Sequence, residues 1–310
     1  MNRTDDDLLR FPRASETVLV CERSRDAGTP DRAREEERGV ICESELRVVV
    51  NGEPLVNLLC SNSALVELAH GFLYNERVID SLDEVASFSL DRAAMQARFT
   101  VARDVPEHTC PTISSGFGGK ALLPLEADAG APTPATIPGQ TPGQTPGPLA
   151  FRRRDERHGL DDVLSAMERM NSSAREYRAT RGMHCTALFL HGDLVASYED
   201  VGRHNTLDKV SGRCLLEGID TRGCLLATSG RISAEMMRKA VRMGASAVCS
   251  FSGPTDRAVA LAREANVLLA GYANGKTATF YAGYEPLAKT MRLDRQAAVA
   301  AGGATAVAQR

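Results

Sequence analysis

The sequence predicts an α/β protein, and the second half of the chain gives the clearest evidence for it. From Met183 onward, short apolar stretches of strand length alternate with amphipathic stretches of helix length. Such alternation implies right-handed crossovers and a largely parallel sheet. The expected elements are a hairpin over 186–197, a helix from about 205, strands at 224–228, 247–251 and 267–270, helices at 232–243 and 255–265, and a last strand at 277–281.

A smaller α+β domain is expected over residues 40–123. Leu46, Val48 and Val50 alternate with their neighbours, and Asn51-Gly52 then predicts a two-residue hairpin turn. A helix should follow, with Asn62-Ser63 as its cap, and a second hairpin spans about 86–101. The domain ends in a glycine-rich loop, Ser114 to Lys120, whose backbone can approach a ligand closely.

The remaining segments are distinguished by composition. Residues 1–39 are polar and dense in charge, so a mobile lead-in is expected there. The stretch 124–158 is rich in Pro and Gly and repeats Pro-Gly-Gln-Thr, which is typical of a linker without a core. The C-terminal α/β domain then covers 159–290, and the Ala/Gly-rich tail 291–310 should fray.

Composition limits the class of protein. Hydrophobic residues make up 43% of the 310 residues and the net charge is −3, which describes a globular protein and argues against a nucleic-acid partner. No apolar run is long enough for a membrane span, and the first residues lack a secretory signal, so a cytoplasmic location is expected. The eight cysteines form no C-x-x-C pair, and we expect neither a zinc site nor disulfides.

The candidate site starts at Glu199-Asp200-Val201-Gly202-Arg203-His204-Asn205, between a strand and a helix. Acid, guanidinium, imidazole and amide side chains around one glycine suit an anionic, oxygen-rich ligand. The residues expected to contact it are Asp200, Arg203, His204 and Asn205. The alternative is an exposed loop in which Asn205 merely caps the next helix with Asp208 as its partner.

Two further strand-to-helix junctions have similar chemistry. Ser229-Gly230-Arg231 and Ser252-Gly253-Pro254-Thr255 both follow predicted strands. Ligands of such sheets bind beyond the carboxyl ends of the strands, so these junctions should meet there. Backbone N–H groups at the helix starts, with Arg203, Ser229 and Arg231, would then bind phosphate oxygens. Taken alone, the second junction would be a plain loop and cap.

These motifs together resemble the formate dehydrogenase accessory sulfurtransferase family, FdhD. The matching blocks are Met183 to Ala187, Glu199 to Asn205 with Leu207-Asp208-Lys209, Ser229-Gly230-Arg231 with Glu235, Ser252 to Thr255, and Gly71-Phe72-Leu73 with Glu76. The resemblance implies a cytidine-deaminase-like three-layer α/β domain beside the smaller domain, usually in a homodimer. It further implies sulfur transfer from a cysteine desulfurase to molybdenum bis(molybdopterin guanine dinucleotide), before this cofactor enters apo-formate dehydrogenase.

The resemblance also assigns a cofactor-contacting turn before the last strand. It maps to Tyr272, Ala273, Asn274, Gly275, Lys276 and Thr277. A GDP-like nucleotide would suit this turn and the arginine-bearing corners. Lys276 offers a cation to a phosphate, or it is an ordinary lysine of an edge strand.

One position departs from the family pattern. The family carries its persulfide-forming cysteine in the glycine-rich loop, where this chain has Phe117. Cys110, at the start of that loop, is the candidate substitute, with Lys120 available to lower its pKa; otherwise it only ends the preceding strand. The alternatives are a cofactor-binding assembly chaperone without sulfur transfer, or an unknown ligand.

Zinc-dependent deamination, the other chemistry of a deaminase-like fold, is not expected. It needs a catalytic Glu two residues after the first ligand, and His184-Cys185-Thr186 lacks one. No Pro-Cys-x-x-Cys exists either. His184 could still orient a ligand, or be a buried, hydrogen-bonded histidine.

Overall fold

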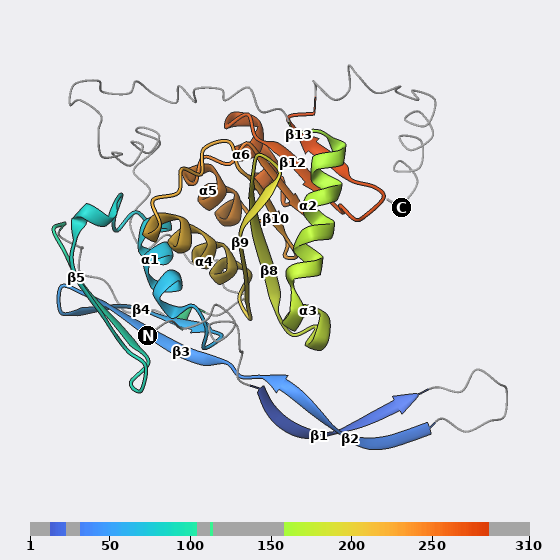
Figure 1. Cartoon of the computed structure of the whole chain (residues 1–310), viewed down its shortest axis with the longest axis horizontal. Helices are drawn as coiled ribbons and strands as arrows, with labels where there is room; N and C mark the ends of the chain where they lie inside the picture. Colours follow the sequence, from blue (N-terminus) through green and yellow to red (C-terminus); the bar gives the residue numbers. More distant parts are fainter. Residues whose placement is uncertain (1–12, 23–31, 104–111, 114–157, 285–310) are drawn as a thin grey trace, which may run out of the picture.

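The computed structural model describes residues 13–22, 32–103, 112–113 and 158–284, which form two packed domains and a projecting hairpin (Figure 1). Several predicted features lie outside these residues: most of the linker, the tail 291–310, the loop from Ser114 to Lys120, Cys110 and Phe117. None of the described helices is long and apolar enough to cross a membrane.

The C-terminal domain is built on a six-stranded sheet with the order β13-β12-β11-β10-β8-β9. Its strands are β8 (His184–Leu190), β9 (Asp193–Asp200), β10 (Leu225–Thr228), β11 (Ala247–Ser250), β12 (Leu268–Gly271) and β13 (Thr279–Ala282). Only β10, β11 and β12 are parallel, so the prediction of a largely parallel sheet is wrong at both edges. The reason is that β8–β9 and β12–β13 are joined by turns too short for a crossover.

Helices cover both faces of this sheet and make three layers (Figure 1). One face carries α2 (Leu160–Ser173) and α3 (Arg175–Thr180), and the other carries α4 (Arg203–Leu216), α5 (Ala234–Arg242) and α6 (Asp256–Glu264). Strand β10 shows how the sequence fills both cores, because Leu225 and Ala227 pack toward α2 while Leu226 packs toward α5. The predicted α/β fold class is confirmed.

The N-terminal domain is a five-stranded sheet in the order β5-β6-β3-β4-β7, covered by α1. Its elements are β3 (Ser44–Val50), β4 (Glu53–Cys60), α1 (Leu65–Asn75), the short helix η2 (Leu82–Glu84), β5 (Val85–Asp91), β6 (Gln96–Val101) and β7 (Thr112–Ile113). The predicted Asn51-Gly52 turn is confirmed, with positive φ at both residues. The predicted helix cap is wrong: Ala64 precedes α1, and the Ser63 hydroxyl lies in a buried cluster instead.

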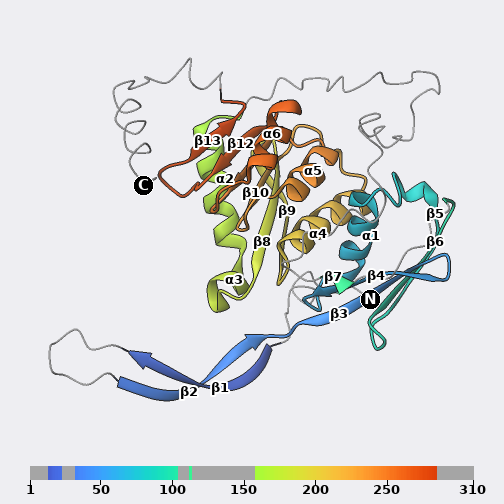
Figure 2. The same cartoon turned by 180° about the vertical axis from the view of Figure 1, so that it is seen from behind.

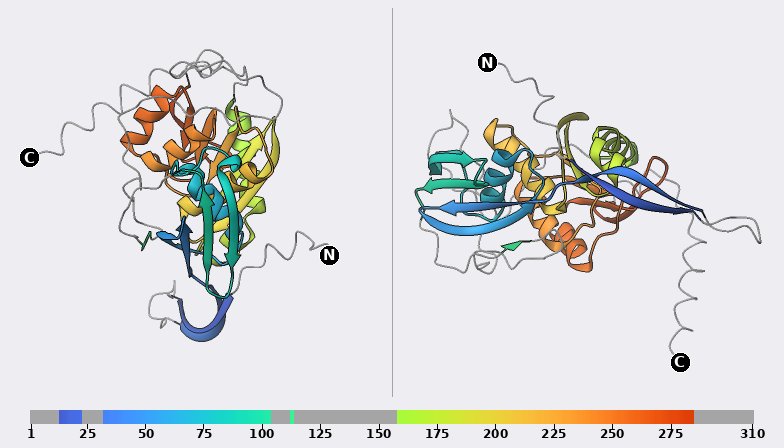
Figure 3. Two further views of the ribbon diagram at one scale, coloured as in Figure 1. Left: turned by 90° about the vertical axis from the view of Figure 1, so that its left-hand side faces the viewer. Right: turned by 90° about the horizontal axis from the view of Figure 1, so that it is seen from below.

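Part of the expected lead-in, residues 1–39, belongs to a hairpin that the sequence analysis does not predict. β1 (Arg13–Glu22) pairs with β2 (Arg32–Ile41) at ten positions. The β-branched run around Val18 favours a strand, and cross-strand contacts supply partners for the polar residues: Thr17 donates to Glu37 (2.6 Å) and Arg34 pairs with Glu22 (2.6 Å). The hairpin projects from the body of the protein (Figure 3).

The two domains meet where α1 crosses α4 (Figure 2). Gly71 and Gly212 lie at the crossing. A Cβ added at Gly71 would be 1.8 Å from the Asp208 carbonyl oxygen, and one at Gly212 would be 1.8 Å from the Glu67 carbonyl oxygen. Both positions therefore need glycine, because the helix backbones are in direct contact there.

Candidate functional site

The strand order brings the predicted corners to one edge of the C-terminal sheet. β10, β11 and β12 end there, β9 also ends there, and β8 begins there because it runs antiparallel to β10. The segments 201–205, 229–231, 252–255 and 272–277 consequently follow one another along this edge. Neighbouring strands are about 4.8 Å apart, so β9 and β12 are separated by roughly 19 Å. An edge of this length suits an elongated ligand.

Arg203 and Arg231 form the cationic centre of this edge. Arg203 is the first residue of α4, and its stem crosses Gly230, where an added Cβ would be 2.9 Å from the Arg203 Cβ. Burial and the neighbouring charge of Arg231 lower the pKa of the Arg203 guanidinium. Arg231 is exposed and makes no ion pair with a described carboxylate. Two neighbouring guanidinium groups favour an anion with several oxygens.

Ser229 and His184 lie beside the arginines. Ser229 Oγ accepts a hydrogen bond from the Cys185 N–H at 3.0 Å and lies 3.4 Å from His184 Nδ1. Burial, and then the charge of Arg203, lower the pKa of the His184 imidazole. His184, which sequence reasoning weighed only as a ligand-orienting or core residue, thus belongs to the same edge.

His204 is buried behind the arginines and connects them to α5. Its Nε2 is 3.4 Å from Ser233 Oγ and 3.5 Å from Glu235 Oε2. Burial, Lys239 and Arg203 lower the pKa of His204 to about 3, and burial raises the pKa of Glu235. The imidazole of His204 is therefore neutral at pH 7, so it can form hydrogen bonds but adds no positive charge. The sequence had placed Glu235 in a motif but not in the site.

Asp200 and Asn205 organise the loop through internal hydrogen bonds. Asp200 is fully buried, and its Oδ1 accepts from the Gly202 N–H (2.9 Å) and Asn205 Nδ2 (2.8 Å). Asn205 Nδ2 also donates to the Leu59 carbonyl oxygen at 2.8 Å. Both side chains thus make internal hydrogen bonds, and their contacts with a ligand stay a prediction. The alternative of Asn205 as the helix cap is wrong, since Gly202 is the capping residue.

The turn over 272–277 divides into supporting and accessible residues. Ala273 is buried and donates its N–H to the Ser250 carbonyl oxygen at 2.9 Å. Asn274 Oδ1 accepts from the Lys276 N–H (2.9 Å) and the Thr277 N–H (3.1 Å), which shapes the turn. Gly275 and Thr277 are exposed, as is Lys276.

Tyr272 forms an aromatic shelf at the same turn. Its side chain is 58% exposed and its φ is +48°. The ring lies across Gly253, where an added Cβ would be 2.6 Å from the tyrosine oxygen. Gly253 therefore allows the close approach, and the exposed part of the ring suits contact with a planar ligand group.

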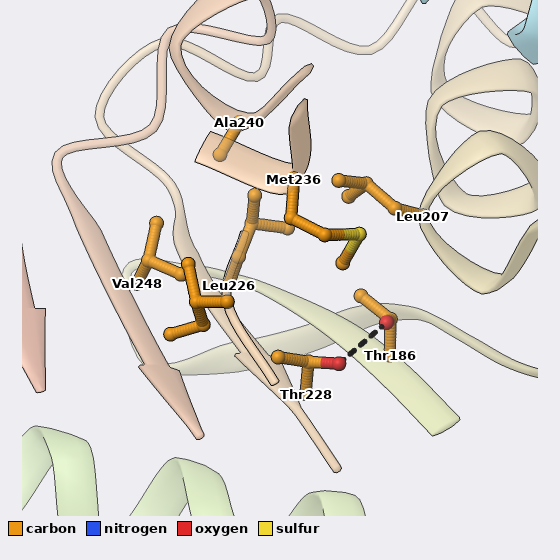
Figure 4. A pocket seen from close by; sticks show the side chains of 8 residues that line it. Thr186, Leu207, Leu226, Thr228, Met236, Ala240 and Val248 are labelled. Carbon is orange, nitrogen blue, oxygen red and sulfur yellow. Dashed lines mark hydrogen bonds between the residues drawn. The ribbon is translucent and has the colours of Figure 1, made fainter. Parts of the chain in front are cut away.

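The interior beneath the edge holds a small cavity between the sheet and the helices. Figure 4 shows a cavity between the sheet and helices α4 and α5, lined by Thr186, Leu207, Leu226, Thr228, Met236 and others. Its volume is about 10 Å³, which is the space of roughly one water molecule. Thr186 donates to Thr228 at 3.1 Å along its floor. Binding is therefore expected at the edge of the sheet and not in the core.

The buried cysteines of the described residues are poor candidates for a reactive thiol. They are Cys60, Cys185, Cys214, Cys224 and Cys249. Burial raises the thiol pKa of all five, to about 12 for the first three. Only the thiolate is a strong nucleophile, so none of these side chains is suited to accept sulfur.

The fold and the edge define a two-domain α/β protein in which two arginines, Arg203 and Arg231, are neighbours at one edge of the larger sheet. The chain belongs to the FdhD/NarQ family, whose model matches residues 41–288. This confirms the resemblance drawn from the motifs.

Three relatives illustrate the relationship. The chain is 34% identical over 255 residues to the sulfur carrier protein FdhD of Bacillus licheniformis, covering 81% of this chain and 90% of the relative. It is 30% identical over 246 residues to sulfur carrier protein FdhD of Bacillus subtilis, covering 78% and 87%. A crystal structure of a protein described as a formate dehydrogenase accessory protein from Desulfotalea psychrophila has the same fold, with a TM-score of 0.66, 20% identity, and coverage of 88% of this chain and 98% of that one.

Proposed function

We propose that this chain is a formate dehydrogenase accessory protein that binds a nucleotide-bearing molybdenum cofactor and carries sulfur to it. The cargo would be molybdenum bis(molybdopterin guanine dinucleotide), the sulfur donor a cysteine desulfurase, and the recipient apo-formate dehydrogenase. The names of the relatives support the accessory and sulfur-carrier roles. The observation that carries the cofactor part is the pairing of Arg203 with Arg231 on an edge that also holds Tyr272 and Lys276.

The groups at the edge, and His204 buried behind them, would have separate tasks in such binding. The two guanidinium groups would hold pyrophosphate oxygens, with the N-terminal N–H groups of α4 adding positive potential. Tyr272 would stack on the guanine, and Lys276 would neutralise a further phosphate. Neutral His204 would donate one hydrogen bond without adding a third positive charge.

Sulfur transfer needs a thiolate near this edge. A thiolate on this chain would attack the terminal sulfur of the desulfurase persulfide, giving a persulfide on this chain and a free thiol on the donor. β7 pairs with β4 so that Ile113 lies opposite Leu58, one residue before the Leu59 carbonyl that accepts from Asn205. β7 therefore ends close to the site loop. Cys110, two residues before Thr112, is the proposed carrier.

A second candidate function is cofactor binding and delivery without sulfur transfer. It is favoured by Phe117, which stands where the family resemblance places the cysteine. The raised thiol pKa of the five buried cysteines also favours it, because they offer no substitute. This chain would then act as an assembly chaperone. In either role we expect a cytoplasmic homodimer. Light scattering after gel filtration would test whether the protein is a dimer.

Calorimetric titration with GDP tests the cofactor part. Arg203→Ala and Arg231→Ala should each weaken GDP binding about 10- to 100-fold, since a hydrogen bond to a charged group contributes about 1.5–3 kcal/mol. Arg263→Ala is the matched control, because this exposed arginine lies at the far end of α6. Equal affinities of all three variants and the unchanged protein would refute the proposed site.

Mass spectrometry after incubation with a cysteine desulfurase and cysteine tests the sulfur part. A carrier gains the mass of one sulfur, and Cys110→Ser loses this gain. No added sulfur on any cysteine, together with intact GDP binding, would leave the chaperone role. Phe117→Cys should then confer sulfur loading.

A further inference from the structure

A buried hydrogen-bond cluster joins the N-terminal domain to the loop that carries Arg203. Its centre is Lys209, which is fully buried on α4. Lys209 Nζ donates to Asp200 Oδ2 (2.5 Å), Ser61 Oγ (2.9 Å) and the Glu199 carbonyl oxygen (3.2 Å). Ser61 follows β4 of the N-terminal sheet, whereas the other three residues belong to the C-terminal domain. The cluster thus spans the domain boundary.

The Asp200 carboxylate accepts hydrogen bonds from both domains. Oδ2 accepts from the Ser61 N–H (3.0 Å) and Ser61 Oγ (2.9 Å). Oδ1 accepts from the Gly202 N–H and from Asn205 Nδ2, within the site loop. A displacement of Ser61 would move or rotate this carboxylate, and the loop bonded to its other oxygen would follow.

Asn205 provides a second link of the same kind. Its amide bonds the Leu59 carbonyl oxygen on β4, two residues before Ser61. The segment from Asp200 to Asn205 is therefore fixed at both ends to the last residues of one N-terminal strand. Arg203 lies between these two anchors. No comparable hydrogen bond to the N-terminal domain is present, among the described residues, at Ser229, Ser252 or the 272–277 turn.

Because the cluster is buried, the two domains have little freedom to shift relative to each other at this point. A lysine with no exposed surface is tolerated only with its partners in place, because an unpaired buried charge is strongly unfavourable. A fully satisfied buried polar network has few alternative arrangements, so it fixes the relative position of its members. The hydroxyl of Ser61 serves both charged groups, as acceptor from Lys209 and as donor to Asp200.

We propose that Ser61 is a positioning residue for the anion site: through Asp200 and Lys209, the N-terminal domain sets the place of Arg203 on the edge of the other domain. The site is then shared by both domains, although Ser61 itself does not touch a ligand. The expected effect on ligand binding rests on the proposed function, whereas the effect of Ser61 on the position of the loop does not.

Hydrogen exchange and GDP titration of the full-length protein test this proposal. Ser61→Ala should speed exchange of the Gly202 and Arg203 amides at least 10-fold and weaken GDP binding at least 10-fold. Exchange in α6 should stay unchanged, which separates a local effect from general loosening. Ser63→Ala is the matched control, since Ser63 Oγ makes only long contacts within the cluster, to Ser61 Oγ (3.3 Å) and Lys209 Nζ (3.4 Å), and no hydrogen bond to Asp200. It should change either quantity less than threefold.

The outcomes separate the two proposals. Ser61→Ala could speed hydrogen exchange in the 200–205 loop while the unchanged protein binds no GDP. This result would refute the nucleotide site and support the positioning role. Unchanged loop exchange in Ser61→Ala would overturn the positioning role, whatever GDP does. Should Ser61→Ala fail to fold, Ser61→Cys, which is close in size but a poor hydrogen-bond partner, takes its place under the same criteria.

Discussion

The α1–α4 crossing allows a worked prediction, the substitution Gly71→Ala. The new Cβ would lie 1.8 Å from the Asp208 carbonyl oxygen and 2.6 Å from the Gly212 nitrogen. Ordinary contact begins near 3.4 Å, so the helices would have to separate by roughly 1.6 Å. Both near atoms belong to helix backbone and cannot rotate away. Overpacking of a well-packed core costs about 3 kcal/mol at the upper end of its usual range.

A helix-propensity gain opposes this cost. Alanine is about 1 kcal/mol better than glycine inside a helix, so the expected net loss in the free energy of unfolding is about 2 kcal/mol or more. Denaturant unfolding followed by circular dichroism measures it. Gly212→Ala should behave alike, and the double variant should lose less than the sum, because one separation of the helices relieves both contacts.

The control is Gly275→Ala. An added Cβ there meets nothing within 4 Å, so its unfolding free energy should stay within about 0.5 kcal/mol of the original. A Gly71→Ala protein as stable as this control would show that the helix contact is looser than the structure has it, and would refute the reasoning.

Three further predictions concern stability. Lys209→Met leaves the Asp200 carboxylate buried without its cation, so unfolding should become easier by about 3–5 kcal/mol; a loss below about 1 kcal/mol in a denaturant titration would contradict this. The pKa of His204 is about 3 in the folded protein and about 6.5 when unfolded, so acid protonates the unfolded chain first and stability falls as pH drops below 6.5. Between pH 6.5 and 5 this contributes about 1.5 kcal/mol, and His204→Gln should flatten the curve there; identical pH profiles would refute it. Thr255→Ala removes the hydrogen bond from the Ala258 N–H to the Thr255 hydroxyl, which caps α6. The free energy of unfolding should fall by about 1 kcal/mol, measured by thermal unfolding. An unchanged stability would show that this cap does not contribute.

Local patterns determined much of the fold. The Asn51-Gly52 turn, the strands and helices after Met183, and the helix through Phe72 were all predicted from residue order and periodicity. The sequence does not predict the hairpin of β1 and β2, because a high density of charge is typical of disorder, whereas here charged residues pair across the strands. The expectation of a largely parallel sheet gives too little weight to the two short connections, the hairpin over 186–197 and the turn before the last strand, which make both edges antiparallel.

The sequence by itself determined which residue types gather at the strand ends, and therefore the arginine-rich character of the edge. Only the tertiary structure decided their roles. Asp200, Asn205 and Lys209 have the same chemistry in sequence as ligand-binding groups, yet all three are buried and bonded to one another or to the other domain. The physical reason is that burial is a property of packing between segments far apart in the chain: Ser61 and Asp200 are 139 positions apart, and no local pattern records their contact.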